Sequence, residues 1–197
     1  MRKLKIAIIG AGGIANYAHA GAYERIDNIE VVAVCDIIAE RAQKLAERLG
    51  AKVHCTDYKE ILKIDGLDAV DICTPNYLHS IIAVDALNHG INVLCEKPDA
   101  INVSEAQKMK SAAEKSGKTL MVIRNNRYMD MSAYLKQYIA DGKMGEIYAA
   151  RCGWQRRRGI PGKGGWFTTK EQSGGGPLID LGVHMIDLSM WLMGNPT

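Results

Sequence analysis

The stretch LKIAIIGAGGIA, residues 4–15, decides the fold of this chain. Its first half is a continuous apolar run, which is typical of a β-strand covered on both faces. Its second half has the spacing G-x-G-x-x-A, in which Gly10 permits a tight turn, Gly12 lets the main chain approach a pyrophosphate, and Ala15 allows close packing of helix on strand. The stretch therefore predicts a strand, a glycine turn and a helix whose N-terminus faces an anion.

Around this stretch, short apolar runs alternate with helical patterns, which favours a parallel sheet with helices on both faces. Gly50, Gly90 and Gly117 each follow a helical pattern, at a place where glycine takes the left-handed conformation at little cost. The predicted fold class is α/β, a Rossmann-type doubly wound parallel sheet. The predicted strands are 4–10, 30–35, 52–55, 69–74, 92–96 and 119–123, and the predicted helices are 13–25, 39–49, 77–89 and 103–116.

The pattern changes after residue 123, so we expect a Rossmann domain over residues 1–124 and an incomplete α+β substrate or oligomerisation domain over residues 125–197. The second part contains a predicted helix at 130–140, one predicted strand at 146–156 and a last helix at 177–193. This last helix is apolar on nearly every face, and such a helix belongs in an interior. We therefore expect a truncated second domain or, alternatively, a surface that packs against another subunit in a homo-oligomer.

Composition excludes several classes of protein. The chain has 197 residues and a formal charge of +3 with scattered basic residues, which is not the pattern of a nucleic-acid-binding surface. No apolar run reaches the roughly 18 residues of a membrane span, so neither nucleic acid nor membrane is an expected partner. The 5 cysteines show no C-x-x-C spacing, which indicates thiols in a reducing cytoplasm and no metal site.

An acidic residue, Asp36, closes the second predicted strand about 20 residues beyond the glycine motif. A carboxylate at this place can accept hydrogen bonds from both hydroxyls of an adenosine ribose and would repel a 2′-phosphate, so NAD is favoured over NADP. Ile37 and Ile38 follow it and supply no cation that would reverse this preference. The alternatives are an Asp36 that only caps the next helix and a glycine turn that binds no nucleotide.

Two further motifs follow predicted strands, where the ligands of doubly wound sheets bind. They are TPNYLH at residues 74–79 and EKP at residues 96–98. Lys97 is the informative residue, because an ammonium beside a nicotinamide can polarise a substrate hydroxyl or relay its proton. The alternative for Lys97 is a solvated lysine at the surface.

A late segment, GGGPLIDLGVHMID at residues 174–187, combines a glycine loop with the start of the last predicted helix. Asp180 and His184 are four residues apart and share one face of that helix. A histidine is suited to take the proton of an alcohol, and Asp180 could orient His184 or bind beside it. The alternatives are a satisfied core histidine at position 184 and a structural role for Asp187.

These four motifs, in this order and at these separations, resemble the glucose–fructose oxidoreductase / inositol dehydrogenase (Gfo/Idh/MocA) family of NAD(P)-dependent sugar and polyol dehydrogenases. The resemblance covers nearly the whole chain. It implies a cis peptide bond at Lys97–Pro98, which proline allows at small cost, and a cytoplasmic NAD-dependent oxidoreductase acting on a sugar, inositol or related polyol.

With the resemblance, the expected site is complete. The expected catalytic residues are Lys97, His184 and Asp180; the expected cofactor-binding residues are Gly10, Gly12, Gly13, Ile14, Asp36, Thr74, Asn76, His79, Glu96 and Lys97; the expected substrate residues are Arg127 and Trp154. For Trp154, a place in the core or at an interface is the alternative.

The chain departs from the family in length, because family members continue into a second domain built on a large antiparallel sheet. There is room here for one strand of that sheet. A second hypothesis is therefore a truncated dinucleotide-binding protein without turnover. A methyltransferase with a similar sheet is disfavoured by the EKP motif and by the pair Asp180 and His184.

Overall fold

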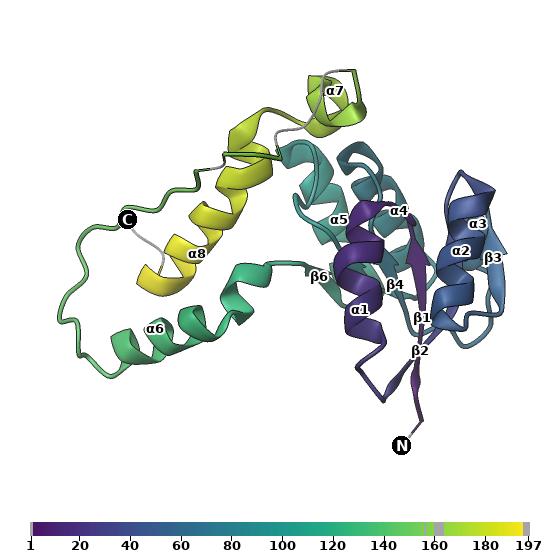
Figure 1. Ribbon diagram of the computed structural model, residues 1–197, viewed down its shortest axis with the longest axis horizontal. Coiled ribbons are helices and arrows are strands. Elements are labelled where there is room, and N and C mark those ends of the chain that lie inside the picture. The colour runs from purple at the N-terminus through teal and green to yellow at the C-terminus, as the bar shows by residue number, and fades with distance from the viewer. Residues whose placement is uncertain (1, 156, 160–163, 195–197) are drawn as a thin grey trace. The chain divides into compact units, whose positions relative to one another are not determined.

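In the computed structural model, a parallel sheet of six strands forms the centre of residues 1–122 (Figure 1). The strands lie in the order β3-β2-β1-β4-β5-β6. The chain therefore builds the sheet outward from β1 to β3 and starts again on the other side of β1 with β4, as in a doubly wound fold. The strands are β1 (Leu4–Ile9), β2 (Ile29–Cys35), β3 (Val53–Cys55), β4 (Ala69–Ile72), β5 (Asn92–Cys95) and β6 (Leu120–Val122).

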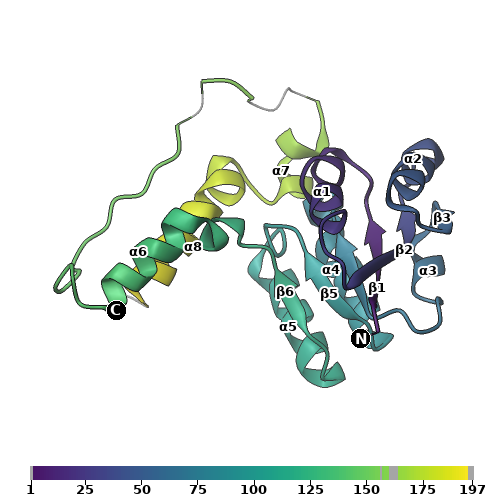
Figure 2. The same cartoon turned by 60° about the horizontal axis from the view of Figure 1, so that its bottom comes forward.

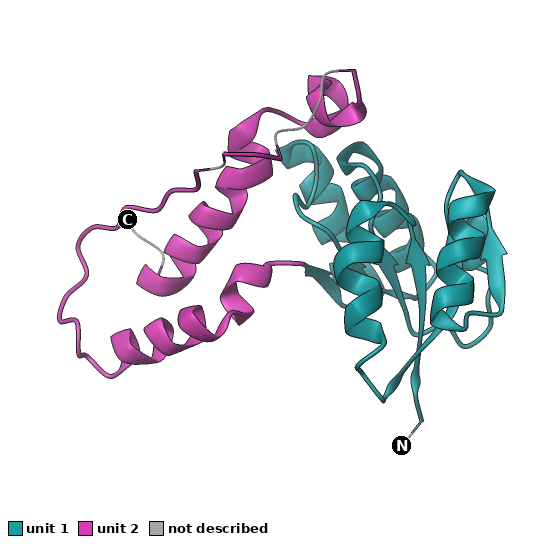
Figure 3. Ribbon diagram, viewed as in Figure 1, with its two compact units in different colours: residues 1–122 teal, residues 123–197 magenta. Residues whose placement is uncertain are grey.

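The structure describes residues 2–155, 157–159 and 164–194. The chain divides into two compact units, residues 1–122 and 123–197 (Figure 3). In the first unit every predicted strand and helix is confirmed. The short helix α3 (Tyr58–Ile61) was not predicted, because a single turn carries too few residues to show a period.

Helices cover both faces of the sheet, because successive residues of a strand point to opposite faces. Ala7 and Ile9 pack in one buried cluster with residues of α3, α4 (Asn76–Asn88) and α5 (Val103–Ser116). Ile8 packs in a second cluster with residues of the first helix and of α2 (Ala39–Leu49). Figure 2 shows α2 and α3 on opposite sides of β2 and β3. The first helix of this unit is the π-helical turn η1 (Ala15–His19), which continues as α1 (Ala20–Tyr23).

The carboxyl ends of four neighbouring strands lie along one edge of the sheet. Cys35 is in register with Ile9, Ile9 with Ile72, and Ile72 with Cys95. The segments that follow these strands therefore leave the sheet side by side. The order of strands reverses between β1 and β4, and the crevice at such a reversal is where ligands of this architecture bind.

The second unit is mainly helical in its described residues. The predicted helix at 130–140 is confirmed as α6 (Asp130–Ala140). The predicted last helix is confirmed as a π-helical turn, η4 (Leu178–Gly182), that continues as α8 (Val183–Met193). Three short helices were not predicted: η2 (Asn125–Tyr128), η3 (Trp166–Thr168) and α7 (Lys170–Ser173).

The strand predicted at 146–156 is wrong for the residues that the structure describes. Residues 146–155 have no regular secondary structure, and Arg156 lies outside the described residues. A strand needs a neighbour to bond its main chain, and the described residues of this unit contain no other strand.

The apolar last helix is only partly covered within this chain: Leu178, Ile186 and Met190 are exposed. Among the described residues, no helix has both the length and the apolar character needed to cross a bilayer.

Candidate functional site

The glycine turn after β1 is held by the segment that follows β4. Gly10 has φ +100°, and a Cβ added to it would lie 2.6 Å from the carbonyl oxygen of Cys73. Only glycine meets both requirements, because other residues are strained at positive φ and no side chain fits against that carbonyl. By contrast, a Cβ added to Gly12 or Gly13 would meet nothing within 4 Å, so the turn is packed on the sheet side and open on the other.

Asp36 braces the same turn from the end of β2. Its Oδ2 accepts the amide of Ala11 at 2.8 Å, and its Oδ1 accepts the amide of Ile38 at 2.9 Å. The residue at the N-cap of α2 is Ile38 rather than Asp36, so Asp36 is more than a helix cap. Each carboxylate oxygen accepts one main-chain bond and can accept another.

The segment after β4 carries three of the expected cofactor residues. Thr74 has a buried Oγ1 with no hydrogen-bond partner in the described structure. Asn76 is buried at the first residue of α4. His79, on the same helix, is fully buried, with Nδ1 2.8 Å from the carbonyl oxygen of Pro98 and Nε2 2.9 Å from that of Thr74.

His79 joins the ends of β4 and β5. Both ring nitrogens face main-chain carbonyls, so the side chain has no further polar atom to offer a cofactor. Burial lowers the pKa of His79. The hydrogen bonds to the two carbonyls act in the opposite direction, but their effect is smaller. A neutral ring donates to one carbonyl at a time. His79 therefore connects the loop at Thr74 to the loop at Pro98.

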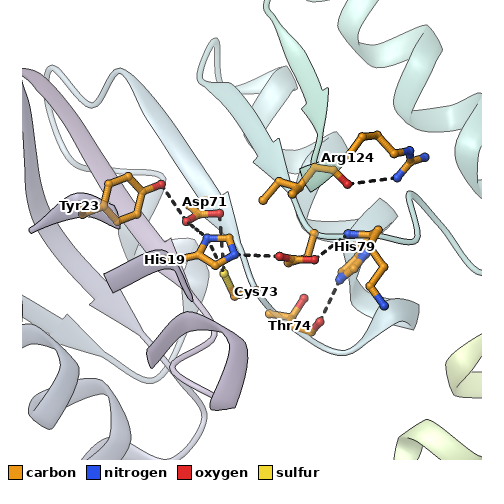
Figure 4. A network of polar contacts seen from close by, with 10 residues as sticks. His19, Tyr23, Asp71, Cys73, Thr74, His79 and Arg124 are labelled. Atoms are coloured by element: carbon orange, nitrogen blue, oxygen red, sulfur yellow. Dashed lines mark hydrogen bonds and ion pairs between the residues drawn. The ribbon is translucent and has the colours of Figure 1, made fainter. Parts of the chain in front are cut away.

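A buried polar cluster lies beside these loops, and sequence analysis missed it (Figure 4). His19, on the first helix, places Nδ1 2.6 Å from Oδ2 of Asp71 on β4 and Nε2 2.8 Å from Oε1 of Glu96. The hydroxyl of Tyr23 donates to Asp71 at 2.8 Å. Figure 4 shows the side chains of His19 and Tyr23 converging on Asp71, with Cys73 next to the imidazole.

The cluster contains one cation between two anions. Burial by itself would lower the pKa of His19, but the hydrogen bonds and charges of Asp71 and Glu96 raise it to about 10. Burial by itself would raise the pKa of Glu96, but the hydrogen bond and charge of His19 and the amide of Lys97 lower it below its ordinary value. Burial and the charge of Asp71 raise the pKa of the Cys73 thiol, which favours its neutral form. The raised pKa of His19, with a carboxylate oxygen at each ring nitrogen, favours the imidazolium.

Lys97 follows Glu96 directly, at the end of β5. Its amide donates to Oε2 of Glu96 at 3.0 Å, and its peptide bond to Pro98 is cis, as the resemblance implied. Its side chain is partly exposed. Glu96, expected at the cofactor, therefore turns its carboxylate back toward His19 and toward the main chain of Lys97.

In the second unit, two expected residues lie in contact. His184 is buried at the start of α8, and its ring centroid lies 5.6 Å from that of Trp154. Asp180 lies in η4, the π-helical turn that precedes α8. Three of the residues expected around the reacting group are thus within one segment and the loop that packs on it.

Arg127 is engaged by an acidic residue of the late motif. Its Nε donates to Oδ2 of Asp187 at 2.7 Å, and a second guanidinium nitrogen donates to Oδ1. Arg124 lies 3.3 Å from the same Oδ1. The expected substrate residue Arg127 therefore joins η2 to α8, and Asp187 has the structural role that the sequence left open.

The first unit fits a dinucleotide. The open side of Gly12 and Gly13 leaves room for a pyrophosphate at the first amides of a helix, which have no partner inside that helix. Asp36 offers acceptor capacity at the end of β2, where the ribose lies in this architecture. The buried Oγ1 of Thr74 is a polar atom that still needs a partner.

Comparison with known proteins agrees with this reading. The family described as "Oxidoreductase family, NAD-binding Rossmann fold" matches residues 4–124, and the GFO/IDH/MocA C-terminal domain matches residues 132–197. The predicted fold class and the predicted family are confirmed. The chain therefore has an NAD(P)-binding Rossmann fold.

Several similar proteins are named as dehydrogenases of a sugar derivative or an inositol. D-glucoside 3-dehydrogenase of Escherichia coli K12 is 40% identical over 193 residues, which make up 98% of this chain and 55% of that protein. A scyllo-inositol 2-dehydrogenase (NADP(+)) of Bacillus subtilis is 32% identical over 195 residues, 98% of this chain and 59% of that protein. A levoglucosan dehydrogenase in complex with NADH has a TM-score of 0.86 at 28% identity and covers 98% of this chain and 54% of its own. The chain spans about half the length of the curated relatives it matches.

Proposed function

Because the chain belongs to the Gfo/Idh/MocA oxidoreductase family, we propose that it binds NAD and transfers hydride between the nicotinamide and a CH–OH group of a sugar, inositol or related polyol. The observation that carries the proposal is the joint arrangement of Gly10, Asp36 and Thr74 at the carboxyl ends of three adjacent strands, β1, β2 and β4. We take residues 1–124 as the nucleotide-binding domain and residues 125–197 as part of the substrate domain, with a cytoplasmic homo-oligomer as the working state.

The preference for NAD over NADP rests on Asp36. Its carboxylate would face a 2′-phosphate as one anion faces another, and at 4 Å such a pair repels by about 4 kcal/mol at an effective dielectric constant of 20. Ile37 and Ile38 are both exposed, and neither can neutralise a phosphate. The two Asp36 oxygens, which accept the amides of Ala11 and Ile38, could each accept a further hydrogen bond from a ribose hydroxyl of NAD.

The proposed reacting groups are Lys97 of the first unit and His184 and Asp180 of the second. When bound, the nicotinamide accepts or returns the hydride. Lys97 donates a hydrogen bond to the substrate oxygen and stabilises negative charge on it. His184 takes the hydroxyl proton as the carbinol carbon is oxidised, and returns it in the reverse direction. Asp180 orients His184 or binds a neighbouring hydroxyl, and Trp154, whose ring is tilted by 49° against that of His184, limits the rotation of the imidazole.

Two measurements test the proposal in sequence. Calorimetry with NADH and with NADPH should show tighter binding of NADH, and no heat with either one would refute it. A panel of sugars and polyols, followed by the absorbance of NADH, then tests turnover. Lys97→Ala should lower the rate by about two orders of magnitude or more, whereas Lys110→Ala, an exposed lysine of α5 paired with Glu114, should not.

The outcome also separates the alternatives. NADH binding without turnover on any member of the panel would favour a dinucleotide-binding protein that does not catalyse. Turnover that survives Lys97→Ala would show that the oxygen is polarised by another group.

A further inference from the structure

The contact between His19 and Glu96 has no role in the chemistry described above, although it lies one residue from Lys97. We propose that His19 is a positioning residue for Lys97, holding the Glu96 carboxylate that fixes the Lys97 main chain and keeping that carboxylate from pairing with the Lys97 ammonium. The importance of Lys97 rests on the proposed function; the contact itself does not.

The geometry forms an unbroken path. Nε2 of His19 lies 2.8 Å from Oε1 of Glu96, and Oε2 of the same carboxylate accepts the Lys97 amide at 3.0 Å. His19 is 8% exposed and Glu96 9%, so water does not compete strongly for these bonds. The glycine-turn helix and the loop that carries Lys97 are therefore joined by one imidazole.

A purely structural explanation accounts poorly for this arrangement. Removing two carboxylates and an imidazolium from water is costly, and apolar residues of similar volume often stabilise a core equally well. Asp71 alone, with the hydroxyl of Tyr23, would satisfy one side of the imidazole. Stability alone therefore does not explain the second carboxylate, Glu96, which places an ion pair with His19 next to Lys97.

The donor atoms of His19, Asp71 and Cys73 lie within 4.8 Å of one another, as the ligands of a metal site would. A metal would need a deprotonated ring nitrogen, whereas the two nitrogens of His19 lie 2.6 Å and 2.8 Å from carboxylate oxygens, an arrangement that favours a protonated ring donating to both. The cluster is therefore an ion-pair network.

Loss of the imidazolium has a definite consequence. With His19→Gln, the negative charge of Glu96 is no longer balanced by a buried cation. The Lys97 ammonium belongs to the next residue, and its charge already acts on Glu96, so the unbalanced carboxylate attracts it more strongly. An ammonium drawn to that carboxylate is held away from a substrate oxygen and is a poorer nucleophile.

The test measures Lys97 directly in the nucleotide-free chain. Brief acetylation with acetic anhydride, followed by mass spectrometry, gives the rate at Lys97 relative to exposed lysines such as Lys44. We expect His19→Gln to slow acetylation of Lys97 about threefold to tenfold, as an added unit charge nearby would. Tyr23→Phe removes a hydrogen bond from the same cluster but leaves the arm to Glu96 intact, so its rate should match that of the parent chain.

The double variant His19→Gln/Glu96→Gln removes the released charge and should restore the rate of acetylation. Equal rates in His19→Gln and Tyr23→Phe would overturn the proposal. If His19→Gln does not fold, Glu96→Gln keeps the shape of the side chain and should speed acetylation, and an unchanged rate would likewise overturn it.

Turnover and binding complete the design. With an active substrate, His19→Gln should lower kcat while leaving the Kd of NADH within about twofold, since the hydrogen bonds of the His19 ring go to Asp71 and Glu96 and not to the glycine turn. A chain that binds no NADH would refute the proposed function and still leave the acetylation test of His19 valid.

Discussion

Asp36 accepts the main-chain amide of Ala11 at 2.8 Å, across 25 residues of sequence. The carboxylate expected to contact the ribose therefore also shapes the turn expected to receive the pyrophosphate. A single side chain thus connects the two elements that we propose to bind the two parts of the nucleotide. Substitution of Asp36 should then affect the choice between cofactors as well as overall affinity.

Asp36→Ala should weaken NADH binding by about tenfold or more, because hydrogen bonds to a charged group contribute about 1.5–3 kcal/mol each. NADPH should lose less, since the repulsion of its 2′-phosphate disappears at the same time. Calorimetric Kd values for both coenzymes give the ratio directly.

Asp57→Ala is the matched control. Asp57 follows β3 and accepts the amide of Lys59 at 2.9 Å, as Asp36 accepts that of Ile38. It should cost about 1 kcal/mol of stability as a lost helix cap without changing the ratio. An unchanged ratio in Asp36→Ala would remove Asp36 from cofactor selection.

Gly10→Ala should destabilise the first unit by about 3 kcal/mol or more. The added Cβ would lie 2.6 Å from the Cys73 carbonyl oxygen in addition to the strain of φ +100°. Gly50→Ala, at φ +69° with nothing within 4 Å of its Cβ, should cost only the strain, about 1 kcal/mol. Urea unfolding followed by circular dichroism compares the two, and equal losses would contradict the packing argument.

The contrast between these glycines illustrates what the sequence could predict. The turn at Gly10 and the helix ends at Gly50 and Gly117 are local, so a short window of sequence contains the whole signal. The Rossmann sheet follows because many such windows agree. The prediction of a strand at 146–156 was wrong because a strand depends on a neighbouring strand. The local sequence cannot show whether such a neighbour exists.

The site divides in the same way. Gly10, Asp36 and Lys97 stand in motifs, whereas His19 and Glu96 meet across 77 residues, and no spacing rule connects them. One signal was available: Asp71 interrupts an apolar strand, and a buried carboxylate needs a partner. His19 and Tyr23, four apart on one helix, were suitable partners. The hydrogen bond from Arg127 to Asp187 spans 60 residues, and no comparable signal in the sequence pointed to it.

The buried cation should make stability fall with rising pH. The folded chain holds a proton on His19 up to a pKa of about 10, whereas the ordinary value is 6.5. The stabilisation is complete below the unfolded pKa and is lost as pH rises through the folded one. Between these values the free energy of unfolding should fall by up to about 1.4 kcal/mol per pH unit. The lowered pKa of Glu96 acts at the other end, with stability lost as pH falls below its ordinary 4.5.

Urea unfolding at about pH 7 and about pH 9 measures this slope. His19→Gln should flatten it, while His54→Gln, an exposed histidine of β3, should leave it unchanged. A parent chain with no slope in this window would mean that His19 is neutral when folded.

Asp187→Ala should destabilise the second unit selectively. Asp187 is 12% exposed and receives the bidentate bond of Arg127, with Arg124 also close. Removing one partner of a partly buried ion pair leaves the other charge uncompensated, and we expect a loss of about 1–3 kcal/mol. Asp141→Ala breaks an ion pair with Lys143 that is far more exposed, so it should cost less than about 1 kcal/mol.

The three tryptophans make this prediction easy to localise, because Trp154, Trp166 and Trp191 all belong to residues 123–197. Tryptophan fluorescence therefore follows the second unit alone during unfolding. Asp187→Ala should move the fluorescence transition to lower urea while NADH binding by the first unit stays unchanged. A fluorescence midpoint equal to that of Asp141→Ala would show that the pair of Arg127 and Asp187 does not hold η2 to α8, and Arg127 would then be available to bind substrate.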